Sequence, residues 1–128
     1  MERHAVIVAG FGFRTDATYD SMRDALVRAR AGLPCPQLQA LAAPADKAPH
    51  LDALAKELGL PIMPIEDAAL REIDTPTRSL ASLAARRTGS VAEAAALAAA
   101  GPNAVLLTAR HISSDRMATC AIAQGVST

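Results

Sequence analysis

Apolar and polar positions along this chain follow two patterns, one typical of buried strands and one typical of helices. Residues 4–9 form a continuous apolar run that is β-branched in its middle, as in a strand buried on both faces. Met22, Ala25, Leu26 and Ala29 then recur at helical spacing. This spacing predicts a helix that begins after a cap at Thr18 and ends near residue 31.

The rest of the chain repeats the order of strand and helix until its last two strands. Further strands are predicted at 37–43, 62–65, 104–108 and 118–123, and further helices at 49–58, 66–72 and 90–100. About nine residues separate the last two strands, too few for a helical crossover, so these strands should pair antiparallel. The pattern therefore predicts an α/β fold: a three-layer α/β/α sandwich with about five strands in a mostly parallel sheet whose last strand is antiparallel. Residues 78–88 fit either a short helix or a mobile segment.

Length, charge and cysteine content narrow the class of protein. The 128 residues suit a single domain, 1–128. The 13 basic residues balance the 13 acidic ones, which argues against charge-driven binding to nucleic acid or to a membrane surface. Cys35 and Cys120 lie far apart, and we find no signal peptide and no apolar stretch near the roughly 20 residues that span a bilayer. We therefore expect reduced thiols in a cytoplasmic protein.

The first strand leads into a glycine-containing segment that ends in an arginine: Gly10, Phe11, Gly12, Phe13 and Arg14. A turn here, just before a helix, would aim backbone N–H groups at an anion, and the guanidinium would suit a carboxylate or phosphate. Alternatively, the two glycines only form a tight strand-to-helix turn.

Known nucleotide and metal motifs do not match. Thr15 stands where the dinucleotide fingerprint needs its third glycine, and no Gly-Lys-Ser/Thr follows, so NAD and ATP are poorly supported. His4, His50 and His111 lack ligand spacing. The sequence therefore predicts neither a cofactor nor a metal site.

The chain has two phenylalanines, one tyrosine and no tryptophan, and all three aromatic residues lie in or just after the glycine-containing segment: Phe11, Phe13 and Tyr19. Aromatic faces beside a site for anions suit a flat, conjugated, acidic ligand. Alternatively, one or both phenylalanines seal the edge of the core.

Further polar residues follow other predicted strands. In open α/β sheets, ligands bind beyond the carboxyl ends of the strands. The residues that we expect there, besides those of the first segment, are Asp46, Lys47, Gly89, Ser90, Glu93 and Arg110. For Lys47 the alternative is a solvated surface lysine. For Glu93 the alternative is a capping box in which its carboxylate accepts from the Ser90 N–H, whereas a role as general acid or base would need a raised pKa.

Four segments of the chain form a recognisable set. They are the Val-Ala-Gly-Phe-Gly-Phe-Arg opening, residues 43–47 with the Leu-Ala-Lys-Glu-Leu-Gly-Leu-Pro of 54–61, Gly-Ser-Val-Ala-Glu-Ala-Ala-Ala at 89–96, and Ala-Thr-Cys-Ala-Ile-Ala at 118–123. Together they resemble the CobE family of cobalamin biosynthesis, which is equivalent to the C-terminal domain of CbiG, the cobalt-precorrin-5A hydrolase. They come in the family's order and cover nearly the whole chain.

The resemblance implies a role in building the corrin ring. Corrin intermediates are conjugated macrocycles fringed by carboxylates, which fits the predicted site. The implied function is binding of a precorrin or corrinoid intermediate as a carrier or assembly factor, with another enzyme of the pathway or a second copy of the chain as possible partners. The alternative is a hydrolase that opens a ring lactone with loss of a two-carbon fragment.

The chain departs from the family pattern in four ways. Phe13 stands where the family often has cysteine, Arg110 stands where it often has lysine, and no acidic residue follows Lys47 closely. The regions that precede this domain in the hydrolase are not expected here. The catalytic residues therefore stay unassigned.

Overall fold

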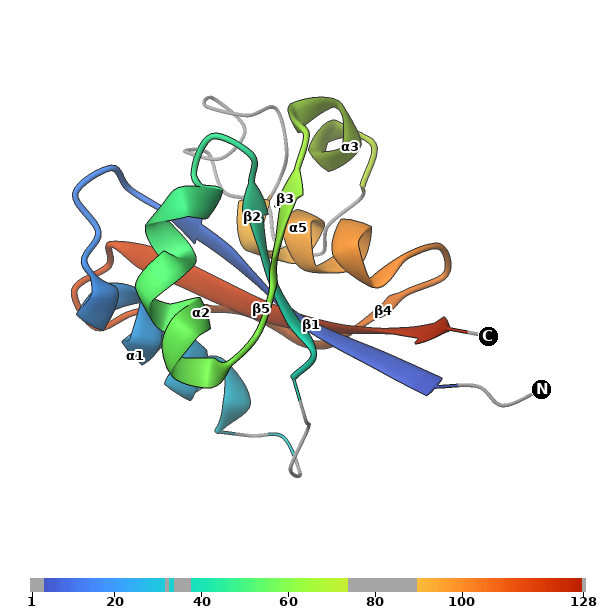
Figure 1. Ribbon diagram of the computed structural model, residues 1–128, viewed down its shortest axis with the longest axis horizontal. Helices are drawn as coiled ribbons and strands as arrows, with labels where there is room; N and C mark the ends of the chain where they lie inside the picture. The colour runs from blue at the N-terminus through green and yellow to red at the C-terminus, as the bar shows by residue number, and fades with distance from the viewer. Residues whose placement is uncertain (1–3, 32, 34–37, 74–89, 128) are drawn as a thin grey trace.

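A five-stranded sheet organises the described part of the chain in the computed structural model, which covers residues 4–31, 33, 38–73 and 90–127 (Figure 1). The strands are β1 (His4–Phe13), β2 (Ala40–Pro44), β3 (Ile62–Ile65), β4 (Val105–Ile112) and β5 (Ala118–Ser127). Their order in the sheet is β3-β2-β1-β5-β4. The first three strands are parallel, and β5 runs antiparallel to both of its neighbours. The predicted mostly parallel sheet with an antiparallel last strand is confirmed.

Helices cover both faces of this sheet. They are α1 (Tyr19–Arg30), the 3₁₀ helix η1 (Ala48–Leu51), α2 (Asp52–Leu58), α3 (Asp67–Arg71) and α5 (Val91–Ala100). Ala9 and Phe11 of β1 pack on the side of α1 and α2, whereas Val8 packs on the side of α3 and α5. Because side chains alternate along a strand, β1 contributes to two cores, as the three-layer prediction requires. None of the helices among the described residues is long and apolar enough to cross a membrane.

The helix ends follow the sequence signals closely. Thr18 caps α1 through a reciprocal capping box with Ser21, and Gly59 ends α2 in the left-handed conformation at φ 69°. Pro64 lies on β3, which is an edge strand, where a residue without an N–H costs no ladder hydrogen bond. Residues 78–88 lie outside the described part of the chain.

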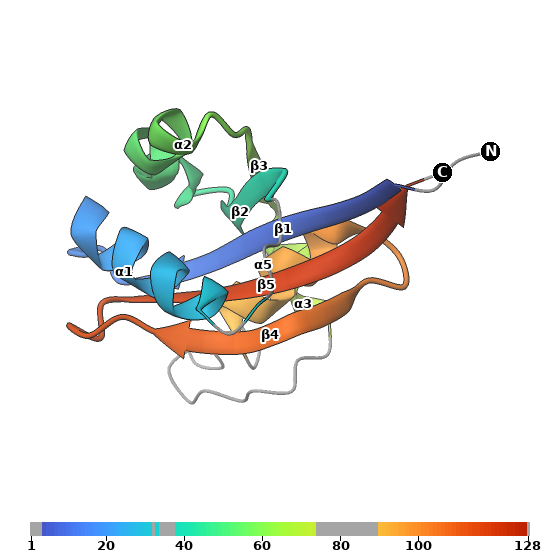
Figure 2. The same ribbon diagram turned by 90° about the horizontal axis from the view of Figure 1, so that it is seen from below.

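Three strands are longer than predicted, and this corrects the interpretation of the glycine-containing segment. β1 continues to Phe13, which pairs with Ala118 of β5, so residues 10–13 form strand rather than turn. β4 likewise continues to Ile112 and β5 to Ser127. In Figure 2, β1, β5 and β4 run side by side along their length. The long antiparallel ladder extends all three strands beyond the apolar runs that indicate them in sequence.

Gly10 of β1 allows close packing of a helix on the sheet instead. A Cβ at Gly10 would lie 2.3 Å from the carbonyl oxygen of Ala92 and 2.4 Å from the backbone nitrogen of Ala96, both in α5. Gly125 of β5 meets the same helix, with the Ala100 carbonyl oxygen 2.0 Å from the position of a Cβ. Small residues on the strands and alanines on α5 therefore let this helix lie against the sheet.

Candidate functional site

The carboxyl ends of β1 and β2 bring two loops together at one edge of the sheet. The Lys47 Nζ lies 3.3 Å from the Thr15 Oγ1 and 5.6 Å from the centroid of the Phe13 ring. The His50 ring packs edge-on against the Phe13 ring, with centroids 5.6 Å apart and planes at 81°. We call Phe13, Thr15, Lys47 and His50 the edge cluster. Its existence shows that the two strand-to-helix junctions meet, as the parallel pairing of β1 and β2 requires.

The edge cluster lies at the surface of the protein. Phe13 and Lys47 are half-buried, and Thr15 and His50 are exposed. Arg14, next to Phe13, is also exposed, while its backbone N–H donates to the Met117 carbonyl at 2.9 Å. The lysine is held over an aromatic face, an arrangement worth about 0.5–1 kcal/mol at exposed sites. The edge therefore presents one ammonium beside an aromatic ring, with an exposed arginine at the next position in the chain, and its chemistry suits a conjugated anion.

Three residues of the predicted site that lie in β1 are buried. Phe11 is fully buried in the core under α1 and α2, so the core alternative is correct for this ring. Gly10 and Gly12 are buried strand residues that face α5, so the prediction that they form an anion-binding turn is wrong. The physical reason is that β5 pairs with the whole of this segment. Tyr19, the remaining aromatic residue, is half-buried against the same core as Phe11.

The start of α5 lies at the same sheet edge. Gly12 is close to Val91, and the Ser90 side chain caps the helix by accepting from the Glu93 N–H at 3.3 Å. The Glu93 side chain is fully buried, and its Oε2 accepts from the backbone N–H of Arg110 in β4 at 2.9 Å. Ser90 is therefore the helix cap that the sequence predicts. The Glu93 carboxylate accepts a hydrogen bond from the backbone of β4.

The remaining predicted residues lie around this edge or outside the described chain. Asp46 is exposed in the loop after β2, and Arg110 is half-buried near the end of β4. Gly89 lies outside the described residues. Among the described residues, no three side chains of the types His, Cys, Asp and Glu gather in a way that could hold a metal ion.

Replacing Glu93 tests its structural role. Glu93→Ala leaves the Arg110 N–H without its acceptor, so we expect a loss of about 1–3 kcal/mol in the free energy of unfolding. Glu93→Gln keeps an oxygen that can accept, and its loss should be smaller. Urea unfolding measures both. Unchanged stability of Glu93→Ala together with loss of ligand binding would instead make Glu93 a residue of the site.

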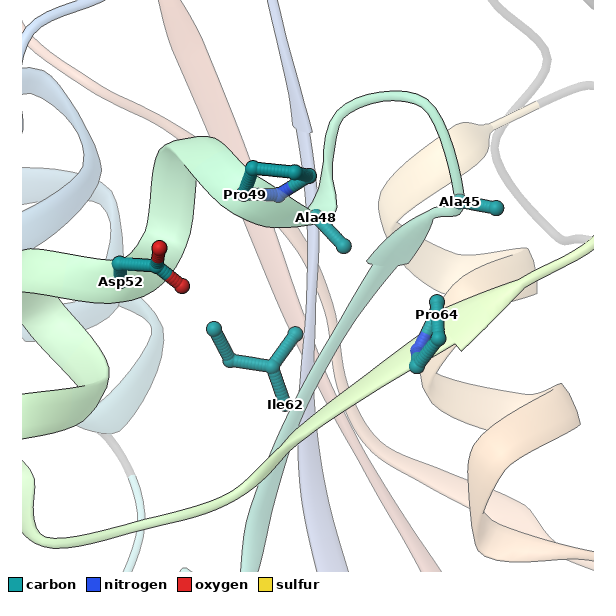
Figure 3. Close-up of a pocket in the computed structure, with 6 residues that line it drawn as sticks. All are labelled: Ala45, Ala48, Pro49, Asp52, Ile62 and Pro64. Carbon is teal, nitrogen blue, oxygen red and sulfur yellow. The ribbon is translucent and has the colours of Figure 1, made fainter.

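A shallow pocket of about 320 Å³ opens beside the edge cluster, between η1 and the ends of β2 and β3 (Figure 3). It is lined by Ala45, Ala48, Pro49, Asp52, Ile62 and Pro64. Its walls are apolar except for one carboxylate, so it does not suit the charged part of an anionic ligand. The Lys47 ammonium of the edge cluster, and not this pocket, has the charge that such a ligand requires.

Sequence reasoning missed two members of the edge cluster. The sequence predicts neither Thr15 nor His50 as a ligand-binding residue. The available signal was topological: both residues follow adjacent parallel strands, and such strands end at the same edge.

Comparison with known proteins identifies the family. The sequence profile of the family described as cobalamin synthesis G C-terminus matches residues 7–123. The chain belongs to this family. The family is one of cobalamin biosynthesis, and the chain is a protein of that pathway. A comparison with curated protein sequences finds no match.

Solved structures agree with membership in the cobalamin synthesis G C-terminus family. CobE, described as a protein from the cobalamin (vitamin B12) biosynthetic pathway, is 32% identical, with a TM-score of 0.84 over 94% of this chain and 90% of that one. Cobalamin biosynthesis protein chiG from Agrobacterium tumefaciens is also 32% identical, with a TM-score of 0.65 over 94% and 98% of the two chains. A putative cobalamin biosynthesis protein G homolog from Sulfolobus solfataricus shares the fold at 20% identity and a TM-score of 0.72, and the match covers 93% of this chain but 36% of that one.

Proposed function

We propose that the protein binds a carboxylate-rich precorrin or corrinoid intermediate at the edge cluster and acts as a carrier or assembly factor. The observation that carries this proposal is the position of Lys47, whose ammonium lies over the Phe13 ring, 5.6 Å from its centroid. The exposed Arg14 is the next residue in the chain after Phe13. Intermediates of a corrin pathway are conjugated rings with several carboxylates on their rim. An aromatic ring with an ammonium over it and an arginine at the next position in the chain is complementary to both features.

The two cations have different parts in this proposal. Arg14 presents a planar fork that can bind one carboxylate through two parallel hydrogen bonds. Lys47 is anchored to Thr15 at 3.3 Å, so its ammonium is already placed near Phe13 before a ligand arrives. Separate carboxylates on one macrocycle can therefore reach both groups.

Mixing the protein with cobyrinic acid and with a precorrin lactone tests carrier function. We expect a shift in the absorbance of the macrocycle that saturates at one equivalent, and recovery of the unchanged compound after the protein is denatured. Release of acetaldehyde with a new carboxylate on the ring would show lactone hydrolysis and overturn the carrier proposal.

A further inference from the structure

Asp115, in the turn between β4 and β5, is connected to both ends of the loop that carries Arg14. Its Oδ1 accepts from the Met117 N–H at 3.0 Å, and the Met117 carbonyl accepts from the Arg14 N–H at 2.9 Å. Its Oδ2 accepts from the hydroxyl of Ser21, whose oxygen in turn accepts from the Thr18 N–H at 3.2 Å. One carboxylate thus links to the first and the last residue of the segment 14–18.

The surroundings of this carboxylate favour a fixed geometry. Ser21 of α1 and Ser113 of the turn are each only 2% exposed, and both donate a hydroxyl to Asp115, Ser113 at 2.6 Å. Buried hydroxyls with a committed acceptor lose their rotational freedom. The Ser113 oxygen also accepts from the Ala118 N–H at 3.0 Å, which connects the turn to the start of β5.

Charge supports the same arrangement at neutral pH. The hydrogen bonds from Ser113 and then Ser21, followed by the Met117 N–H, hold the pKa of Asp115 below its ordinary value of 3.8. The Asp115 carboxylate is therefore ionised at neutral pH, where it only accepts hydrogen bonds. It would become protonated, and lose these acceptor contacts, only as the pH falls below 3.8. The turn makes a second contact with α1, in which Asp24 accepts from the Ser114 N–H at 2.7 Å and from the Arg28 guanidinium at 3.1 Å. In Figure 2 the turn between β4 and β5 lies at the same end of the sheet as the start of α1.

We propose that Asp115 is a positioning residue for ligand binding, because it fixes both ends of the loop 14–18 and thereby orients Arg14 toward the ligand. The loop itself is closed by the Ala17 N–H, which donates to the Arg14 carbonyl at 2.9 Å. With both ends held, the guanidinium starts from a fixed backbone, and less conformational freedom is lost when it binds a carboxylate. The role of Arg14 as a ligand contact rests on the proposed function.

Asp115→Ala and Asp24→Ala form a matched pair for the test. Each removes one side-chain contact between the turn and α1, but only Asp115 is linked to the ends of the loop. We expect Asp115→Ala to weaken binding of cobyrinic acid about fivefold or more and Asp24→Ala to weaken it less than about twofold. Asp115→Asn, which keeps one acceptor oxygen, should lie between them and provides a folded variant if Asp115→Ala is unstable.

Backbone amide exchange without ligand separates this proposal from the proposed function. In Asp115→Ala the amides of Arg14 and Thr18 should exchange about tenfold faster or more, whereas those of α5 keep their rates, as expected of local opening. In Asp24→Ala the Arg14 amide should keep its protection. Equal loss of affinity in both alanine variants, or unchanged exchange of Arg14 in Asp115→Ala, would overturn the positioning role. If the unmodified protein does not bind cobyrinic acid, the proposed function fails, while amide exchange still decides whether Asp115 fixes the loop.

Discussion

Gly10→Ala is expected to destabilise the protein by about 3 kcal/mol or more, at the upper end of what overpacking costs. The new methyl group would lie 2.3 Å from the Ala92 carbonyl oxygen and 2.4 Å from the Ala96 nitrogen. Both are backbone atoms of α5, so no rotation of a side chain can make room. The helix must move away from β1, and contacts in the core between this helix and the sheet are lost with it.

Gly12→Ala is the matched control, because it changes the same residue type in the same strand on the same face. There the nearest atoms are the Thr119 Oγ1 at 3.0 Å and the Val91 Cβ at 3.1 Å, both in side chains. We expect a loss of about 1 kcal/mol, because these contacts are short by only a few tenths of an ångström, and a small shift of Thr119 and of the first turn of α5 relieves them. Urea unfolding compares the variants. Equal stability of the two variants would show that α5 does not pack closely against Gly10. If Gly10→Ala fails to fold and Gly12→Ala folds, the result is an extreme case of the expected one.

Arg14→Ala is expected to weaken binding of cobyrinic acid about tenfold or more, since 1.4 kcal/mol corresponds to one decade of affinity and a charged hydrogen bond contributes about 1.5–3 kcal/mol. Lys47→Ala should weaken binding less, because a flexible ammonium makes a less directed contact than a planar guanidinium. Titration followed by the absorbance of the macrocycle measures both affinities.

Arg30→Ala is the control for charge alone. Arg30 is an exposed arginine in the last turn of α1, far along the helix from the edge cluster. It removes the same formal charge, so its affinity should stay close to that of the unmodified protein. None of the three variants should change the melting temperature by more than a few degrees, because Arg14 and Arg30 are exposed and the contact between Lys47 and Thr15 lies at the surface. Equal losses in Arg14→Ala and Arg30→Ala would mean that only net charge matters.

The order of elements along the chain and the directions of the strands can be predicted from sequence because they depend on local signals, whereas the order of the strands in the sheet is not predicted. Thr18 and Gly59 mark the ends of helices through their own backbone and side-chain chemistry. The short connection before β5 excludes a crossover helix, and this alone predicts the antiparallel pairing that the structure confirms.

The glycines of β1 were misinterpreted because their reason lies in tertiary packing. A Gly-x-Gly segment before a helix looks the same whether it turns at a ligand or continues as strand under a close helix. The alanine content of α5 was visible, but its register against Gly10 was not. The contact of Glu93 with β4 could not be predicted for the same reason. The sequence shows the nearby cap at Ser90, whereas Arg110, whose N–H donates to the Glu93 carboxylate, lies 17 residues farther along the chain.

The sequence predicts the edge cluster in part, because it places Phe13 and Lys47 at this edge. It also places Arg14 there, and the structure brings the loops after β1 and β2 together. The sequence does not show which of Phe11 and Phe13 is buried, because two residues that are two positions apart in a strand lie on the same face of the sheet. Burial of each ring depends on how far the helices that cover this face extend. The structure buries Phe11 fully and leaves Phe13 half-buried beside Lys47.

The central claim is that the sheet edge recognises the carboxylates of a corrin ring. The most direct test is calorimetric titration of the unmodified protein with cobyrinic acid and with its fully esterified, neutral form. Both compounds present the same macrocycle to Phe13, but only the acid can engage Arg14 and Lys47. The account predicts that the acid binds about tenfold tighter or more, and that added salt weakens its binding while leaving that of the ester unchanged. Equal affinity for the two forms, or no binding of the acid, would contradict it.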